Sequence, residues 1–366
     1  MNDGEALILA TVRNRIGHLT LNRASNLNAL TLPMVRQLQQ HLRAWEHNPD
    51  VVAVVLRANG EKAFCAGGDI RMLYQSHLAG DGRHKVFFAQ EYALDEYIHC
   101  YAKPVVALID GLVLGGGMGL VQGASLRVIT ERTRMGMPET AIGFFPDVGG
   151  SYFLSRLPGQ LGTYLGVTGV QVRAADALYA GLADWCISSS QLPELDHCLN
   201  HMSWPQHPAQ ALQALIATLG VDKFPGSELK AMQPVIDRHF ALADVPSIRA
   251  ALQAETTPTF QDWAEETVEV LDSRSPSAMA ITLELLRRGR ELSLSECFAQ
   301  ELQLNGNWFE NGDLKEGIRA RLIDKDHSPV WRPTTLAELD QHFVLAYFDA
   351  QPIHKPLPTA GASSLR

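Results

Sequence analysis

Two glycine-rich loops are the stretches of this chain best suited to chemistry. They are Ala66-Gly67-Gly68 and Gly115-Gly116-Gly117, and each follows a short apolar run and precedes a stretch with helical character. Glycines let the backbone approach another group closely, and free N–H groups at a helix start attract an oxyanion. One such loop alone is more often a tight turn. Two in one core favour a pair of backbone donors for the negative charge that develops in acyl chemistry.

Isolated acids follow the second loop. Glu139 lies just after a proline among apolar neighbours. A single glutamate is usually solvated surface, but desolvation by such neighbours raises a carboxyl pKa into the range useful for proton transfer. Asp147, which precedes Val148-Gly149-Gly150, is either a second functional acid or the cap of a following helix. Glu91 on an expected helix reads by itself as a surface residue, and Asp69 reads as a helix N-cap.

Other motifs are weak or missing. The chain has no GxGxxG, GxxxxGK[ST], HExxH or GxSxG pattern, which disfavours nucleotide phosphate loops, zinc proteases and serine hydrolases. His197 and His201 could share a helix face, with His207 nearby, but a solvated face explains this spacing better than a metal site. We therefore expect neither a metal ion nor a cofactor.

Composition narrows the class of protein. The 366 residues are 46% hydrophobic and 19% charged, with a net charge of −9 and no basic block, which argues against a nucleic-acid partner. No apolar run approaches the roughly 20 residues that span a membrane. Five scattered cysteines without a CxxC pair favour a reducing compartment. With an acidic start and no leader pattern, these features predict a cytoplasmic protein.

Hydrophobic periodicity predicts an α/β core and a helical remainder. Short apolar runs at 7–12 and 16–21 indicate a hairpin, 51–56 a buried strand, and 30–47 and 87–101 helices. Strands and helices alternate to about residue 187. Helical segments then follow at 206–220, 228–242, 248–254, 260–271, 277–288 and 296–311. We expect a core over 1–188, a mainly helical region over 189–351 and a flexible tail over 352–366.

Several motifs resemble the crotonase (enoyl-CoA hydratase/isomerase) superfamily. The superfamily match rests on the stretches 22–30, 60–70, 114–120 and 173–184. Two further stretches, 137–150 and 316–331, are similar to the 3-hydroxyisobutyryl-CoA hydrolases within that superfamily. The resemblance implies a layered β-β-α core, built as a spiral of ββα units, with a helical C-terminal region.

The resemblance also implies roles for particular residues. The N–H groups of Ala66 and Gly116 would form an oxyanion hole for a thioester carbonyl. Glu139 and Asp147 would be catalytic, and Glu91 would contact the substrate together with Gly67, Gly68 and Asp69. Hydratases of the superfamily carry a first catalytic glutamate three residues past the middle glycine, where this chain has Gly119. This difference argues against addition of water to a double bond.

We therefore expect an acyl-CoA thioester hydrolase of the 3-hydroxyisobutyryl-CoA type, as in valine breakdown. Coenzyme A enters as part of the substrate, and the subunit number is left open, with a homo-oligomer among the choices. One alternative is an enoyl-CoA hydratase or isomerase acting on short-chain enoyl-CoA. The other is a CoA-ester binding protein without turnover, against which the retained Glu139 and Asp147 argue.

Overall fold

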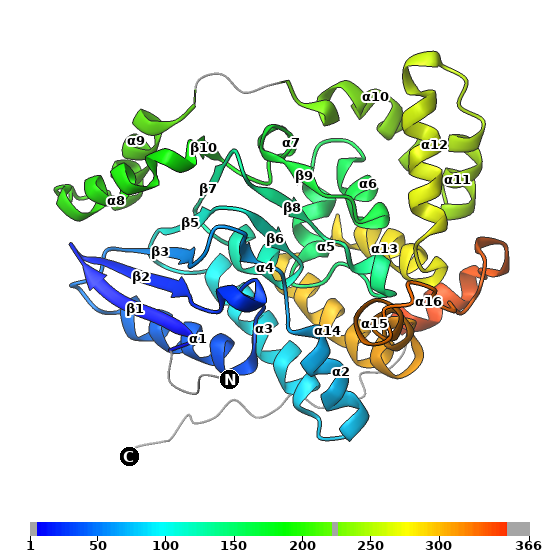
Figure 1. Ribbon diagram of the computed structural model, residues 1–366, viewed down its shortest axis with the longest axis horizontal. Coiled ribbons are helices and arrows are strands. Elements are labelled where there is room, and N and C mark those ends of the chain that lie inside the picture. Colours follow the sequence, from blue (N-terminus) through cyan, green and yellow to red (C-terminus); the bar gives the residue numbers. More distant parts are fainter. Residues whose placement is uncertain (1–5, 222–225, 350–366) are drawn as a thin grey trace.

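The computed structural model describes residues 6–221 and 226–349, and Figure 1 shows their arrangement. The strands run from the left side of the molecule to its middle, and helices lie above, below and to the right of them. The tail that we predict over 352–366 lies outside the described residues, as do the last two residues of the region over 189–351.

The larger sheet has six strands, in the order β1-β2-β3-β5-β7-β10. The predicted hairpin is formed by β1 and β2, which are antiparallel and place β1 at the edge, while the remaining pairs are parallel. Parallel strands buried on both faces need continuous apolar runs, and β5 supplies one that is buried throughout. The strands are β1 (Ile8–Arg13), β2 (Ile16–Leu21), β3 (Ala53–Ala58), β5 (Val105–Ile109), β7 (Leu126–Thr130) and β10 (Trp185–Ile187).

A second sheet of four very short strands, in the order β4-β6-β8-β9, positions the glycine loops. β4 and β6 are parallel neighbours, so their carboxyl ends meet at one edge. One glycine loop follows each of these two ends. Runs of two or three residues carry too little periodicity to be recognised in the sequence. The strands are β4 (Ala63–Cys65), β6 (Leu112–Leu114), β8 (Arg134–Gly136) and β9 (Val172–Arg173).

Helices of the first half cover these sheets. The predicted helix at 30–47 is α1, which begins after Thr31, whose side chain accepts from Met34 N–H, and which buries its apolar stripe. The predicted helix at 87–101 is α3, which starts four residues earlier than its apolar pattern. The helices are η1 (Ala24–Asn26), α1 (Leu32–Glu46), α2 (Ile70–Ala79), α3 (Arg83–His99), α4 (Gly116–Gln122), η2 (Glu139–Ile142), α5 (Gly150–Phe153), η3 (Leu154–Arg156), α6 (Leu161–Thr168) and α7 (Ala174–Ala180).

The second half is helical over its described residues, as predicted. From 188 to 221 and from 226 to 349 the chain forms no strand, and one isolated bridge joins Ile187 to Gly220. The helices are η4 (Ser189–Gln191), α8 (Leu192–His201), α9 (Pro208–Leu219), α10 (Glu228–Phe240), α11 (Val245–Gln253), α12 (Pro258–Asp272), α13 (Pro276–Gly289), α14 (Leu294–Asn311), α15 (Leu314–Ile318), η5 (Arg319–Ile323), η6 (Leu336–Glu338) and α16 (Gln341–Asp349).

The C-terminal helices share the core of the first half. Figure 1 shows α14 beside α3, and the two helices are in contact. Phe298 and Trp308 of α14 belong to the same buried apolar cluster as Phe88 and Tyr92 of α3. Removing α14 would therefore expose apolar surface of the first half to water, at about 25 cal/mol per Å². The division of the chain at residue 188 stays a prediction.

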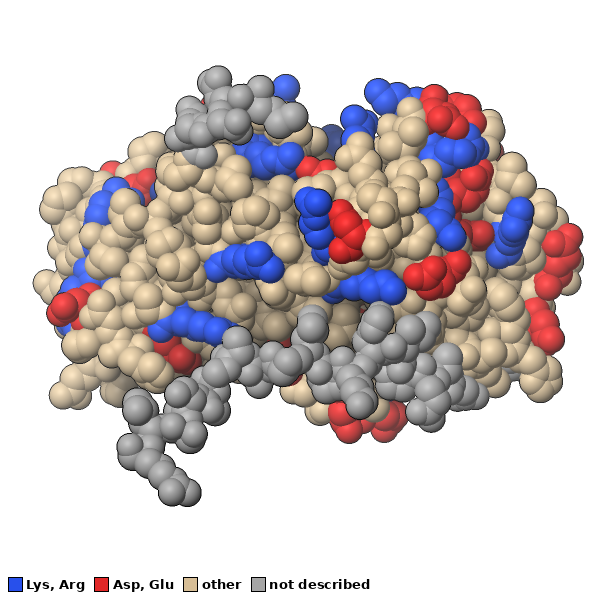
Figure 2. Space-filling model, turned by 90° about the horizontal axis from the view of Figure 1, so that it is seen from below, with Lys and Arg blue, Asp and Glu red and all other residues tan. Residues whose placement is uncertain are grey.

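The surface carries charges of both signs. On the face seen in Figure 2, Lys and Arg lie interspersed with Asp and Glu. All five cysteines are free thiols, and Cys65, Cys186 and Cys297 are buried. Within the part of the chain that the structure describes, no helix is both long and apolar enough to cross a membrane.

Candidate active site

One cavity of about 230 Å³ brings together both glycine loops and three of the acids singled out in the sequence. Gly67, Gly68 and Gly116 line it on the loop side. Glu91 of α3 and Asp147 enter it from other elements. Glu139 at the start of η2 completes the set, and the remaining wall is mostly apolar, with Phe87, Phe88, Phe144 and Arg321 among its members.

The backbone donors differ from those expected. Ala66 N–H donates to the carbonyl of Leu27 at 3.0 Å, so the prediction that it holds a substrate oxygen is wrong. Gly68 N–H and Gly116 N–H have no hydrogen-bond acceptor in the described structure. The two glycines are adjacent, since a Cβ added at Gly116 would lie 3.4 Å from Gly68 N. The oxyanion hole that this geometry offers is therefore Gly68 with Gly116.

Each glycine of the second loop makes room for one neighbour. A Cβ at Gly115, where φ is +49°, would lie 2.7 Å from Glu139 Oε1, and one at Gly116 would overlap Glu91 Oε1. One at Gly117 would lie 2.6 Å from the Cys65 carbonyl oxygen. Glycine is thus required at all three positions, because a side chain there would collide with an acid or with the backbone.

The three acids are buried, with exposed fractions of 2% for Glu91, 8% for Glu139 and 5% for Asp147. Burial and the nearby Asp147 raise the pKa of Glu139 well above its usual value. Burial, with Asp147 and Glu139 close by, likewise raises the pKa of Glu91. Burial raises the pKa of Asp147 to about 7, although Tyr92 opposes the shift. The sequence-based view of Glu91 as a surface residue is wrong, because α3 turns it inward.

Asp147 is held by its side chain and does not cap a helix. Tyr92 of α3 donates its hydroxyl proton to Asp147 Oδ2 at 2.6 Å. The following helix, α5, has Gly149 as its N-cap and no side-chain cap. Neither Tyr92 nor its partner Asn305, which donates to the Tyr92 hydroxyl at 3.0 Å, was singled out by the sequence. A buried tyrosine has no local pattern that would identify it.

Asp95 is a further acid that the sequence did not reveal. It lies one helical turn after Glu91, is fully buried, and neither of its carboxylate oxygens has a hydrogen-bond partner in the described structure. A Cβ at Gly119 would lie 2.5 Å from Asp95 Oδ2 and 2.7 Å from the Val148 Cβ. Asp95 therefore fills the space beside Gly119, the position where hydratases of the resembled family carry a glutamate. Burial, with Glu91 nearby, raises the pKa of Asp95 well above its usual value.

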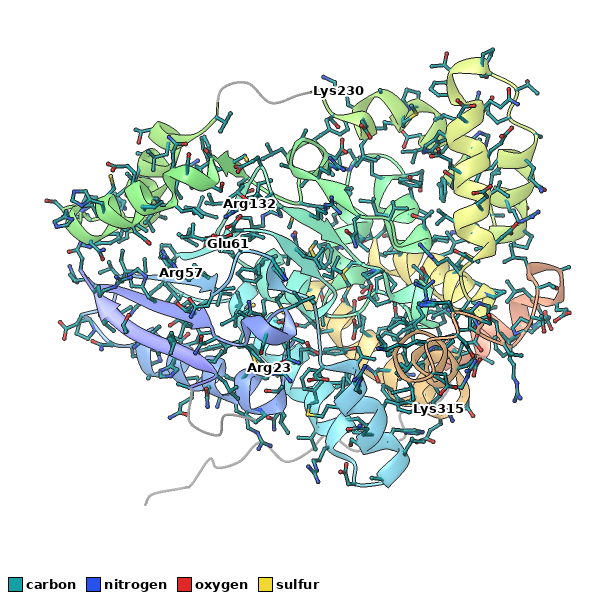
Figure 3. All side chains as sticks on the ribbon, in the orientation of Figure 1. Arg23, Arg57, Glu61, Arg132, Lys230 and Lys315 are labelled. Carbon is teal, nitrogen blue, oxygen red and sulfur yellow. The ribbon has the colours of Figure 1, made fainter. Side chains whose placement is uncertain are left out.

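Asp69 does not line the cavity. Its side chain caps α2 by accepting from Met72 N–H at 3.2 Å. The other carboxylate oxygen pairs with Arg23, labelled in Figure 3, at 2.8 Å. The structural interpretation of Asp69 as an N-cap is thus confirmed, and the structure gives no support to its expected substrate contact.

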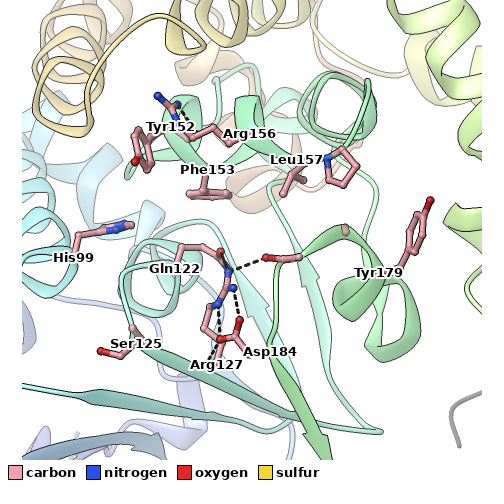
Figure 4. Close-up of a pocket in the computed structure, with 14 residues that line it drawn as sticks. His99, Gln122, Ser125, Arg127, Tyr152, Phe153, Arg156, Leu157, Tyr179 and Asp184 are labelled. Carbon is pink, nitrogen blue, oxygen red and sulfur yellow. Dashed lines mark hydrogen bonds and ion pairs between the residues drawn. The ribbon is translucent and has the colours of Figure 1, made fainter. Parts of the chain in front are cut away.

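A larger hollow of about 540 Å³ lies elsewhere, and Figure 4 shows its lining. Arg127 there is paired with Asp184 at 2.6 Å and also donates to Gln122 and the Gly181 carbonyl. Arg156 stacks on Tyr152 and donates to backbone carbonyls. Because the protein itself uses both guanidinium groups, this hollow offers a ligand little specific chemistry.

The histidines singled out above do not form a metal site. His197 and His201 are exposed, with ring centroids 4.3 Å apart, and His207 is exposed as well. Among residues 6–221 and 226–349, no group of three His, Cys, Asp or Glu side chains could hold a metal ion.

Comparison with known proteins gives the same family from sequence and from structure. The enoyl-CoA hydratase/isomerase family model matches residues 16–348. The mitochondrial 3-hydroxyisobutyryl-CoA hydrolases of Gallus gallus and Homo sapiens are 38% and 37% identical to this chain. The matches cover 93% and 94% of this chain, and 88% and 89% of those proteins.

Two solved structures are similar over nearly their whole length. A carnitinyl-CoA dehydratase from Mycobacterium thermoresistibile is 38% identical, with a TM-score of 0.86, and the match covers 95% of this chain and 97% of that one. An enoyl-CoA hydratase from Rhodobacter sphaeroides is 36% identical, with a TM-score of 0.84, and the match covers 94% and 97%. Together with the family model, these similarities show that this chain has a crotonase fold and belongs to the enoyl-CoA hydratase/isomerase family.

Proposed function

We propose that this protein hydrolyses a short, branched 3-hydroxyacyl-CoA thioester, with 3-hydroxyisobutyryl-CoA as the preferred substrate. The reaction consumes water and releases 3-hydroxyisobutyrate and free CoA, a step of valine breakdown. The relatives that carry the 3-hydroxyisobutyryl-CoA hydrolase name match this chain over about nine tenths of its length.

One observation carries the proposal: two free backbone donors and three buried carboxyl groups line the same small cavity. Gly68 N–H and Gly116 N–H would hold the thioester oxygen and stabilise its negative charge in the transition state. Such donors act strongly here because the cavity wall is largely apolar, and electrostatic interactions are stronger in surroundings of low polarity.

Glu139 would act in its ionised form, by one of two routes. As a nucleophile, its carboxylate attacks the carbonyl carbon, the C–S bond breaks, and the thiolate leaves and takes a proton; water then opens the anhydride. As a base, Glu139 takes a proton from water, which attacks the carbonyl carbon directly; the C–S bond then breaks, and the leaving thiolate takes the proton from Glu139. In both routes Asp147 and Glu91 orient the substrate hydroxyl or the acid group.

A panel of acyl-CoA esters with a thiol reagent tests the function. We expect free CoA to appear fastest from 3-hydroxyisobutyryl-CoA, more slowly from its unbranched and non-hydroxylated analogues, and with no added metal or nucleotide. Single turnover in heavy-oxygen water tests whether Glu139 acts as a nucleophile. Label appearing in Glu139 indicates an anhydride opened at the glutamyl carbonyl.

The second candidate is hydration of a short enoyl-CoA, because one of the similar solved structures is called an enoyl-CoA hydratase. Gly119 argues against it, because hydratases of the family carry their first catalytic glutamate at this position and the space beside Gly119 is filled by Asp95. Efficient hydration of crotonyl-CoA without release of thiol would replace our proposal with this one. Tight binding of the esters with no turnover would favour a binding protein.

A further inference from the structure

Three side chains on one face of α14 reach toward the candidate site. Glu301, Asn305 and Trp308 follow the spacing i, i+4, i+7, which places them along one side of a helix. All three are buried, with exposed fractions of 0% for Glu301 and 4% for Asn305. Their hydrogen-bond partners lie about 150 or more residues earlier in the chain.

Glu301 holds the turn that carries Asp147. Its carboxylate accepts from Gly149 N–H at 2.7 Å and from Ser151 N–H at 2.9 Å, and the Ser151 hydroxyl donates to it as well. This turn contains Val148 at φ +52°, in the left-handed region that β-branched residues avoid. A strained backbone of this kind persists only where surrounding contacts fix it, and Glu301 supplies three of them.

Asn305 and Trp308 act on the other parts of the site. Asn305 Nδ2 donates to the Tyr92 hydroxyl at 3.0 Å, and that hydroxyl donates to Asp147 Oδ2 at 2.6 Å. Trp308 Nε1 donates at 2.7 Å to the carbonyl of Gly143, the C-cap residue that follows η2. Since η2 starts at Glu139, this bond anchors the turn that presents the glutamate.

We propose that this face of α14 positions both acids, with Glu301 and Asn305 acting on Asp147 and Trp308 on Glu139. The three are positioning residues and touch no substrate themselves. The expected effects on kcat rest on the proposed function. The expected effects on the Asp147 pKa rest on the hydrogen bonds alone. The C-terminal helical region thereby sets the geometry of the two acids.

The protonation of Asp147 provides a direct readout of this arrangement. The titratable groups that face it are Glu91, Tyr92 and Asp95 from α3, Glu139 from η2 and Glu301 from α14, while Arg321 lines the same cavity. The Tyr92 hydroxyl bond favours the ionised form of Asp147 and lowers its pKa. Loss of that bond, or of the donor that orients the Tyr92 hydroxyl, should therefore raise the Asp147 pKa.

The test compares Asn305→Leu with Asn307→Leu, Tyr92→Phe and the double variant Asn305→Leu/Tyr92→Phe. Asn307 is a matched control, because it lies on α14, is 5% exposed, and its side-chain amide donates to the Tyr347 carbonyl and not to Tyr92. The Asp147 pKa is measured in the full chain by carbon NMR of labelled aspartate carboxyls, with the signal assigned by its absence in Asp147→Asn. This measurement needs no turnover.

We expect Tyr92→Phe to raise the Asp147 pKa by about one unit, the worth of a typical hydrogen bond. Asn305→Leu should raise it by less, Asn307→Leu should leave it unchanged, and Asn305→Leu should add nothing in the Tyr92→Phe background. With the hydrolase substrate, Asn305→Leu should lower kcat, leave KM unchanged and shift the kcat–pH profile. If Asn305→Leu lowered kcat only by disturbing the packing, it would lower kcat equally in the Tyr92→Phe background.

A second variant tests the Trp308 contact. Trp308→Phe keeps an aromatic ring but removes the N–H, so kcat should fall several-fold at constant KM. An unchanged Asp147 pKa in Asn305→Leu, or an equal shift with and without Tyr92, would overturn the role of Asn305. Unchanged kcat in Trp308→Phe would overturn that of Trp308. If the wild-type chain releases no CoA, the proposed function fails, while the NMR titration still decides the Asn305 proposal.

Discussion

The glycine loops and α14 both position buried acids of the candidate site, but in opposite ways. The loops lack side chains, so that Glu91 and Glu139 can pack against bare backbone while Gly68 and Gly116 keep free N–H groups. Helix α14 supplies side chains, which hold the turns around the acids. The comparison indicates that the loops carry the chemistry and that the C-terminal region sets its geometry. Changes in the loops should therefore cost more turnover than changes in α14.

The largest loss should follow removal of the reacting acid. Glu139→Gln keeps the size of the side chain but can neither attack nor accept a proton, so we expect kcat to fall by at least about 100-fold with KM little changed. Steady-state hydrolysis of 3-hydroxyisobutyryl-CoA measures this. A variant that keeps more than about a tenth of the wild-type kcat would reject both proposed roles.

A pair of glycine substitutions, one in the second glycine loop and one on α14, compares the two regions directly. Gly116→Ala places a methyl group where it overlaps Glu91 Oε1, so that the glutamate or the loop must shift, and losing one oxyanion donor typically costs about 100- to 1,000-fold in kcat. Gly306→Ala on α14 is the matched control, because its Cβ would meet nothing within 4 Å. In a helix interior this change stabilises by about 1 kcal/mol. Equal activity of the two variants would contradict the assignment of Gly116 as a donor.

The buried Asp95, packed against Gly119, should lower the free energy of unfolding as pH rises. The unfolded Asp95 carboxyl loses its proton near pH 4, whereas the folded one keeps it to a higher pH because its pKa is raised. Between these two pKa values the unfolded state binds fewer protons, so the free energy of unfolding falls by up to about 1.4 kcal/mol per pH unit. Asp95→Asn removes this contribution.

Urea unfolding at pH 5 and pH 8 checks this expectation. The stability of Asp95→Asn relative to wild type should increase from pH 5 to pH 8, while the contributions of the other buried acids remain in both proteins. Parallel pH dependences would mean that Asp95 is ionised in the folded protein.

The smallest effect should come from the cavity residue contributed by the C-terminal region. Arg321 is the one Lys, Arg or His among the residues lining the cavity, and it is partly exposed. A CoA ester carries phosphates, and an exposed ion pair is worth about 0.2–1 kcal/mol. Arg321→Met should therefore raise KM about 1.5- to 5-fold at constant kcat, whereas Lys315→Met, away from the cavity, should not. A fall in kcat would place Arg321 with the catalytic groups.

Features of the site that depend on neighbouring residues could be predicted from the sequence, whereas features that depend on distant residues could not. Gly116, Glu139 and Asp147 are recognisable because glycine runs and isolated acids stand out locally. The Ala66 donor was misplaced because the N–H that points into the cavity depends on the pairing of residues 27–30 with the loop. Glu91 was misjudged as surface because a single acid on a helix carries no sign of the face it occupies.

The sequence by itself determined the family, the two glycine loops and the change from alternating strands and helices to helices alone, because each is written in short-range patterns of residue type. The tertiary structure alone decided which two N–H groups remain free, that Asp95 fills the space beside Gly119, and that Glu301, Asn305 and Trp308 reach the acids. These contacts join residues up to 213 positions apart. Local periodicity cannot encode them, because they exist only once α14 has packed against α3.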